Sequence, residues 1–109
     1  MDMPVEVAEV GKLLFGRPCR LALALWIAGH EKGRFFQSEP PREVILPGDL
    51  GKELARLVRL DMLQEERPDG DRRVWYTRTD SRLWGVIEAA ADALQAKQLD
   101  DPSYRANNL

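Results

Sequence analysis

The chain is poor in the residues on which disulfides, metal centres and hydrolytic sites depend. Its 109 residues include one cysteine, Cys19, and one histidine, His30. A single cysteine excludes a disulfide within the chain, and the pair falls short of the four ligands that a structural zinc ion takes. A phosphate-binding glycine loop and a nucleophile motif are also missing. We therefore expect a protein that is not an enzyme and that holds neither a metal ion nor a cofactor.

Long apolar segments are missing as well. The first residues, MDMPVEVAEV, carry no basic region followed by an apolar run, so we expect no signal peptide. The longest apolar run, LALALWIA over residues 21–28, is far shorter than the roughly 20 residues that span a bilayer. These absences predict a cytoplasmic protein without a membrane partner.

A strong net charge is the third absence. The chain has 16 Lys and Arg against 18 Asp and Glu, which gives a formal charge of −2 at pH 7. A protein that coats nucleic acid without sequence preference is usually basic, so this balance argues against that class. It leaves room for a specific binder with a local basic face, because charge is screened beyond about 8–10 Å at physiological salt.

The spacing of apolar residues predicts a mainly helical domain. Helices are expected over residues 5–15, 17–30, 39–44, 47–63 and 81–97. Pro18 and Pro47 fall in first turns, where a missing N–H costs nothing. The second helix is apolar nearly all round, which is typical of the buried centre of a domain. The positions of the 47–63 helix that are expected to face the core are Leu50, Leu54, Leu57, Val58 and Met62.

A β-hairpin is expected between the last two helices. Pro-Asp-Gly at residues 68–70 is a turn signal, since proline presets φ, aspartate bonds to the backbone and glycine takes a positive φ. The strands on either side are expected over residues 63–67 and 72–79. Period-two alternation divides the return strand into one face with Val74 and Tyr76 and another with Arg73, Trp75 and Thr77. We expect Trp75 to pack on the last helix or on a partner subunit.

The order helix, helix, short helix, helix, hairpin, helix resembles that of winged helix-turn-helix regulators, and three motifs are similar to those of the ArsR-like family. RPCRLALALWI, residues 17–27, resembles the signature of the family's second helix, in which a proline and an arginine precede an aliphatic stretch. LGKELARLVRLDMLQEE, residues 50–66, resembles the recognition helix and the step into the wing. DGDRRVWYTRTD, residues 69–80, resembles the wing. MarR-like proteins share these features.

Two departures limit what the resemblance implies. ArsR-like recognition helices usually begin with serine or threonine hydroxyls, whereas this chain has Gly48, Asp49 and Gly51 at those positions. Few side chains at the start of the helix are then left to read bases. The metal-sensing cysteine pair of the family is missing too, so a response to metal is not implied.

The resemblance implies a winged helix-turn-helix domain over residues 1–98, mainly α with a small β-hairpin wing, followed by an unstructured tail over 99–109. It also implies a homodimeric transcriptional regulator, such as a repressor, that binds a double-stranded DNA operator. The recognition helix, 47–63, would enter the major groove, and the wing, 64–79, would lie on the backbone or in the minor groove. The residues expected to contact DNA are Gln37, Asp49, Lys52, Arg56, Arg67, Arg72 and Arg73, with a further backbone contact from Arg20.

The terminal helices carry the apolar stripes that the resemblance assigns to dimerisation. The expected interface residues are Val7, Val10, Leu14, Trp84, Ile87 and Leu94, although the same stripes could instead close the core of a single chain. Another class of function also fits: a winged-helix adaptor that binds a protein partner and little or no DNA. Residues 51–82 hold eight positive and seven negative side chains, so DNA binding depends on how these charges divide between faces. No motif supports or excludes a small-molecule effector.

Overall fold

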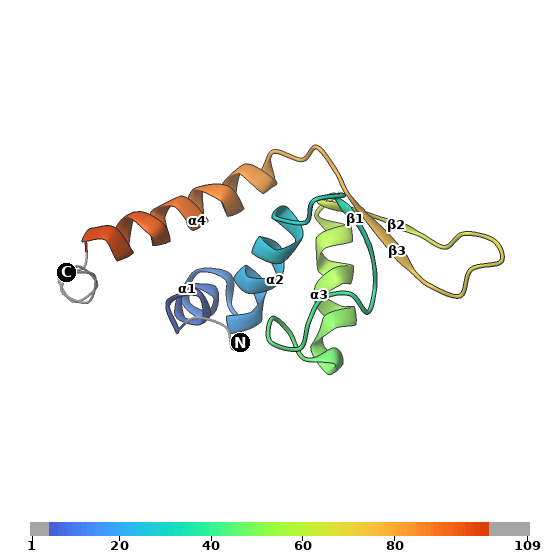
Figure 1. The fold of residues 1–109 in the computed structure, drawn as a ribbon, viewed down its shortest axis with the longest axis horizontal. Coiled ribbons are helices and arrows are strands. Elements are labelled where there is room, and N and C mark those ends of the chain that lie inside the picture. Colours follow the sequence, from blue (N-terminus) through green and yellow to red (C-terminus); the bar gives the residue numbers. More distant parts are fainter. Residues whose placement is uncertain (1–4, 101–109) are drawn as a thin grey trace.

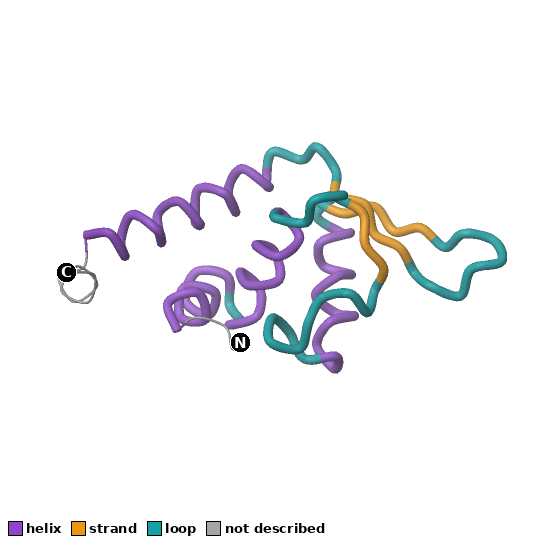
Figure 2. Tube along the Cα trace, viewed as in Figure 1, coloured by secondary structure: helices purple, strands orange, loops and turns teal. Residues whose placement is uncertain are grey.

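The computed structural model describes residues 5–100, which form four helices and one three-stranded antiparallel sheet (Figure 1). In chain order the elements are α1 (Val5–Phe15), α2 (Pro18–Ala28), β1 (Arg34–Phe36), α3 (Pro47–Arg59), β2 (Leu63–Glu66), β3 (Trp75–Arg78) and α4 (Leu83–Asp100). The β-hairpin projects away from the helices, on the side opposite α1 (Figure 2). The chain is thus a mixed α/β domain in which one end of the sheet reaches out into solvent.

The centre of the domain is α2, as its all-round apolar sequence predicts. Leu21, Leu23 and Ile27 are at most 1% exposed. They pack in a core to which α3, α4 and the three strands also contribute. The helix begins at Pro18, whose fixed φ suits a first turn. It ends at Ala28, slightly inside the expected range, because the chain turns at the glycine that follows.

Arg78, at the end of β3, closes the C-terminal end of α2. Its Nη1 donates hydrogen bonds to the carbonyl of Ile27 at 2.7 Å and to that of Ala28 at 2.9 Å. A guanidinium in this place satisfies carbonyls that have no partner within the helix and complements the negative end of the helix dipole. The contact fixes the sheet to α2, so Arg78 serves the fold itself.

The short helix expected over residues 39–44 is wrong, because this segment is a loop with a single turn. The carbonyl of Pro41 accepts hydrogen bonds from the amides of Val44 at 2.9 Å and Ile45 at 3.2 Å, and no further turn follows. Pro40 and Pro41 lack the N–H groups that a helix interior needs. The loop still contributes to the core, since Ile45 is only 3% exposed.

The strand before this loop is one that the sequence pattern missed. β1 pairs antiparallel with β3, which also pairs with β2, so the strand order is β1-β3-β2. Phe35 of β1 is fully buried and stacks on Tyr76 of β3, with 5.7 Å between the ring centroids. A strand of three residues is too short to show the alternation from which strands are predicted.

The helix α3 ends before the expected residue 63, because the chain adopts a left-handed turn. Asp61 has φ +60°, and its amide bonds to the carbonyl of Val58 at 3.0 Å. The amide of Met62 bonds to the carbonyl of Leu57 at 2.9 Å. This is the Schellman arrangement, which satisfies the last carbonyls of a helix through one residue in the left-handed conformation. It directs the chain into β2.

The strands of the hairpin are shorter than expected, and the loop between them is longer. Residues 67–74 lie outside β2 and β3, so the predicted strands over 63–67 and 72–79 are too long. The turn itself is confirmed: Gly70 has φ +78°, and the amide of Asp71 bonds to the carbonyl of Pro68 at 3.2 Å. Tyr76 points into the core on the predicted face and is 4% exposed.

The last helix, α4, packs on α2, and its Trp84 and Ile87 belong to the core. Trp84 is 6% exposed, and its indole nitrogen donates to the carbonyl of Met62 at 3.0 Å. The helix continues to Asp100, so the first two residues of the tail expected over 99–109 are helical. Residues 101–109 of that tail lie outside the described part of the chain.

Candidate nucleic-acid interface

The charged residues of α3 divide between two sides of the helix. Leu50 and Leu54 face the core, as predicted, with 7% and 0% exposed. Both acidic residues, Asp49 and Glu53, turn toward α2, and Glu53 is only 4% exposed. The side that faces solvent, which we call the α3 outer face, consists of Gly48, Gly51, Lys52, Ala55 and Arg59. This face therefore carries cations and no carboxylate.

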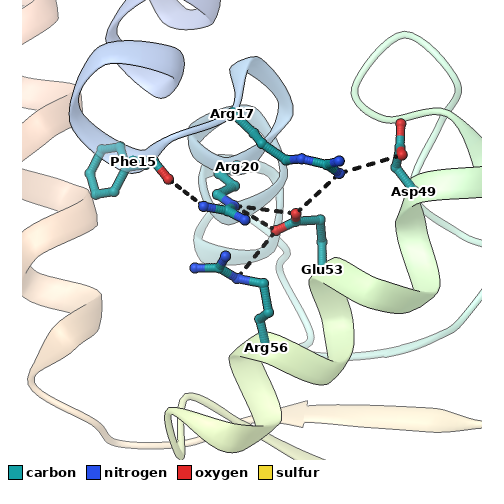
Figure 3. Close-up of polar contacts among 6 residues, drawn as sticks. All are labelled: Phe15, Arg17, Arg20, Asp49, Glu53 and Arg56. Atoms are coloured by element: carbon teal, nitrogen blue, oxygen red, sulfur yellow. Dashed lines mark hydrogen bonds and ion pairs between the residues drawn. The ribbon is translucent and has the colours of Figure 1, made fainter.

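Three arginines surround Glu53 (Figure 3). The Nε of Arg20 lies 3.2 Å from each carboxylate oxygen, and the Nε of Arg56 lies 3.7 Å from one of them. The Nη1 of Arg17 lies 3.8 Å from Glu53 and 3.5 Å from the carboxylate of Asp49. We call these five residues the Glu53 cluster. It joins α2 to α3 and carries one more positive than negative charge.

The Glu53 cluster holds the interior side of α3 in place. A carboxylate as buried as that of Glu53 is stable only when cations and hydrogen bonds compensate for lost water. Arg20 also donates from Nη1 to the carbonyl of Phe15 at 2.6 Å, so one guanidinium links α1, α2 and α3. Arg20 is thus committed inside the chain, unlike the DNA contact expected of it. Beside the cluster, burial and then the charges of Glu53 and Asp49 raise the pKa of the Cys19 thiol.

A hollow of about 430 Å³ lies between the start of α3 and the hairpin. Its lining brings together Gln37, Arg72 and Arg73, which were expected to contact DNA and come from two distant segments. Arg42 of the loop between β1 and α3 lines it as well. No carboxylate is among the described residues that form this wall. We call it the wing hollow, and its arginines converge beside the first turn of α3.

The three arginines near the wing tip differ in their partners. Nε and Nη2 of Arg73 each lie 3.1 Å from a carboxylate oxygen of Asp71, which also accepts a bond from the Arg73 amide at 2.9 Å. These bonds hold the pKa of Asp71 far below its ordinary range and raise the pKa of Arg73. Arg67 lies 3.6 Å from Glu65. Arg72 is exposed and forms no ion pair within residues 5–100, so it is the wing cation most open to phosphate.

Trp75 lies on the outer face of the sheet. It does not pack on α4, which was one of the two positions expected for it. Its ring meets that of Phe36 edge to face, with 5.5 Å between the centroids. The guanidinium carbons of Arg34 and Arg73 lie 4.2 Å and 4.8 Å from the Trp75 ring, in cation–π geometry. The indole nitrogen donates to Asp71 at 3.0 Å. Arg73 is therefore held by both the carboxylate and the ring, which fixes the base of the wing.

The structure places the expected DNA contacts in different surroundings. Gln37, Arg72 and Arg73 line the wing hollow, Lys52 lies on the α3 outer face, Asp49 and Arg56 belong to the Glu53 cluster, and Arg67 lies in the hairpin loop. Arg42 and Arg59 were missed. Arg59 is two helical turns from Lys52, so helical spacing could have found it. Arg42 lies in the segment that was wrongly predicted as a helix, so its direction could not be read from the sequence.

The residues expected at a dimer interface differ in their exposure. Trp84 and Ile87 are 6% and 7% exposed and belong to the core of a single chain. The members that are partly buried against the same core are Val7, Val10 and Leu94. Leu14 is 68% exposed and its neighbour Leu13 is 76% exposed. The end of α1 is thus the part of this set that stays open to a partner.

Neither a metal centre nor a membrane-spanning helix is found among the described residues. Among the described residues, no group of three His, Cys, Asp or Glu side chains is arranged to hold a metal ion. No helix between residues 5 and 100 has both the length and the apolar character to cross a bilayer. No protein-family model matches the chain, and no curated protein or solved structure matches it significantly. Geometry and charge are therefore what a functional proposal must rest on.

Proposed function

We propose that this chain is a cytoplasmic winged helix-turn-helix regulator that binds double-stranded DNA as a homodimer. In this proposal α3 enters the major groove, and the hairpin is the wing on the flanking backbone or in the minor groove. The element order supports it: the single turn over residues 41–45 and α3 take the places of the two helices of the helix-turn-helix, and β2 and β3 follow as the wing. The first helix of the usual pair is reduced here to a single turn.

The division of charge on α3 is the observation that carries the proposal. An outward carboxylate would be repelled by DNA phosphates, but Asp49 pairs with Arg17, the residue before α2, and Glu53 pairs with Arg20 of α2. Lys52 and Arg59 remain on the α3 outer face, where they can donate to phosphates or to the guanine acceptors O6 and N7. Gly48, Gly51 and Ala55 on the same face have no side chain or a single methyl group, which allows close approach of the helix to the groove. A mildly acidic chain thereby gains a local basic face.

The wing hollow supplies the backbone contacts of the proposal. Arg42 and Arg72 line it from different segments of the chain, and Gln37 adds an amide that can donate to a phosphate oxygen. Contacts to phosphate set the register of a protein on the duplex and do not distinguish bases. Specificity would therefore come from the few side chains of the α3 outer face and from the shape of the duplex under the wing.

A homodimer would give this small surface a second half-site. One winged helix covers little DNA, whereas a two-fold dimer reads two half-sites about 34–36 Å apart, one helical turn. The exposed Leu13 and Leu14 at the end of α1 are the residues that we assign to the dimer contact, since water contact with such side chains is unfavourable. The symmetric operator follows from the symmetry of the dimer.

Fluorescence anisotropy with duplexes from the region upstream of its own gene tests the proposal. One duplex should bind better than random DNA of equal length as salt is raised, with a slope of about −0.9 for each phosphate contact. The double variant Lys52→Gln/Arg59→Gln should bind more weakly, and its salt slope should be flatter by the amount expected for the loss of up to about two phosphate contacts. The control Lys12→Gln/Lys32→Gln removes the same charge outside the α3 outer face and the wing hollow. It should change neither the affinity for DNA nor the salt slope.

Two results would contradict the proposal. One is that no duplex competes better than random DNA at any salt concentration. The other is that both double variants change the salt slope equally, because binding would then follow total charge and not the α3 outer face. In either case the protein-binding adaptor becomes the better interpretation, with the exposed end of α1 as its contact surface.

A further inference from the structure

An apolar pocket lies where α2, α3 and α4 meet. Its volume is about 210 Å³, and we call it the helix-junction pocket. Most of its walls are aliphatic: Leu23 and Ala24 come from α2, Leu57 from α3, Leu60 from the residue after α3, and Leu83, Val86 and Ile87 from α4. Met62 and the aromatic ring of Phe15 complete the apolar lining. The pocket therefore offers mainly dispersion contacts to a hydrocarbon.

The polar end of the pocket belongs to the Glu53 cluster. Arg20, Arg56 and Glu53 line it, which leaves a net charge of +1. Figure 3 shows the contacts among these three residues. Arg20 is bonded to both carboxylate oxygens of Glu53, whereas the guanidinium of Arg56 approaches Glu53 only at 3.7 Å and donates no hydrogen bond to any described residue. The Arg56 side chain is 46% exposed. Its N–H groups are therefore available to a ligand at the mouth of the pocket.

Volume, lining and charge together define the ligand. A cavity of about 150 Å³ lined by Leu, Ile and Phe binds benzene, with six carbons, so about 210 Å³ fits roughly eight carbons. We propose that the helix-junction pocket binds an aliphatic carboxylate of about eight carbons. The chain lies between Leu57 and Ile87, and the carboxylate accepts paired hydrogen bonds from the guanidinium of Arg56. Arginine suits this role because its planar fork matches a carboxylate in two parallel bonds.

Charge and size favour this occupant over a second protein chain. A helix is about 10–12 Å across with its side chains, which a recess of about 210 Å³ cannot enclose. A single apolar side chain of another copy could cover the mouth, where Leu60, Leu83 and Val86 are 48%, 41% and 51% exposed. Such a side chain would leave the net positive charge of the pocket's polar end uncompensated, whereas a carboxylate compensates it.

The site also implies a form of regulation, which rests on the proposed function. Arg56 lies on α3 between the helix-junction pocket and the α3 outer face. A bound carboxylate would neutralise this arginine and place a negative charge near the DNA phosphates. The ligand should therefore bind more tightly to the free protein than to the protein–DNA complex. Because the coupling of two binding sites is reciprocal, the ligand should weaken DNA binding by the same factor.

Isothermal titration of the protein with octanoate, and with octanamide as the uncharged probe of equal length, tests the binding site without DNA. Octanoate should bind saturably with one ligand per chain, and octanamide should bind about tenfold more weakly, since hydrogen bonds to a charged group are lost. Arg56→Gln should abolish this preference. Arg59→Gln on the α3 outer face makes the same change of charge outside the pocket and should keep it.

The proposal is overturned by any of three results. Octanoate does not saturate the wild-type protein, octanamide binds equally well, or Arg56→Gln and Arg59→Gln behave alike. If octanoate fails to bind and Val86→Ser dissociates a dimer in sedimentation, the pocket belongs to a second copy. DNA titrations then separate the two proposals: octanoate binding by a protein that binds no operator removes the proposed function alone, and unchanged operator affinity with octanoate removes the regulation alone.

Discussion

Arg20 and Glu53, which are 33 positions apart in the chain, face each other across the contact of α2 with α3, with Arg20 Nε 3.2 Å from both carboxylate oxygens. Neither residue lies on the α3 outer face, yet the pair decides what that face presents. Because Glu53 turns inward to the arginines, Lys52 beside it in the chain points outward with no opposing charge on the α3 outer face. A contact in the interior thus sets the sign of the surface.

Removing one member of the Arg20–Glu53 pair should lower the stability of the fold more per residue than replacing both members with apolar side chains. We expect Arg20→Met and Glu53→Leu each to lower the free energy of unfolding by about 2–3 kcal/mol, at the low end for buried pairs because the arginines are partly exposed. The double variant should lose clearly less than the sum, since neither Arg20 nor Glu53 is then left facing a missing partner. Urea denaturation measures all three, with the exposed Glu43→Gln as a control that should stay within about 0.5 kcal/mol. Additive losses would show that the two residues are not coupled.

The left-handed turn at Asp61 should respond to glycine. A non-glycine residue at φ +60° is strained, and Asp61→Gly should raise the free energy of unfolding by up to about 1 kcal/mol. Asp61→Val should lower it by more than that, because a β-branched residue fits this region poorly. Thermal or urea denaturation gives both values. Equal stability of the two variants would mean that the turn relaxes to another backbone conformation.

The wing should resist acid to a pH below that at which ordinary carboxyl groups titrate. The bonds from Arg73 lower the folded-state pKa of Asp71 below its unfolded value. The stability from this pair is therefore complete above the unfolded value, about 3.9, and is lost as the pH falls through the lower folded one. In NMR spectra the Trp75 indole N–H and the Arg73 amide should keep their shifts down to about pH 3.9. A midpoint at that value would show that the contact is not formed in solution.

Releasing Arg73 should strengthen DNA binding if the wing lies on the duplex. Asp71→Asn removes the bidentate partner of Arg73 and a negative charge from the wing. We expect tighter operator binding and a salt slope that is steeper by about 0.9, for one added phosphate contact. Asp69→Asn removes the same charge from the same turn and leaves Arg73 bound, so it should tighten binding without that change of slope. Anisotropy titrations that give equal slopes for the two variants would take Arg73 away from the DNA.

Features that depend on neighbouring residues were predictable from the chain. Pro18 and Pro47 begin helices and Gly70 takes a positive φ in the wing turn, since each of these preferences is a property of the residue and its immediate sequence. β1 was not predictable, because Phe35 is in a strand only through its pairing with Tyr76. The end of α3 was missed for a related reason: helical apolar spacing continues to Met62, but the backbone turns at Asp61.

The sequence by itself determined the four helices, the buried character of α2 and an arginine-bearing hairpin, because apolar period and turn residues act locally. Only the tertiary structure decided which charges are available. Lys52 and Glu53 are adjacent in the chain, and Arg72 and Arg73 are as well, yet one of each pair is held in ion pairs and the other faces solvent. A carboxylate and a guanidinium from distant segments find each other through packing, and that pairing leaves a basic face on a chain whose formal charge is −2.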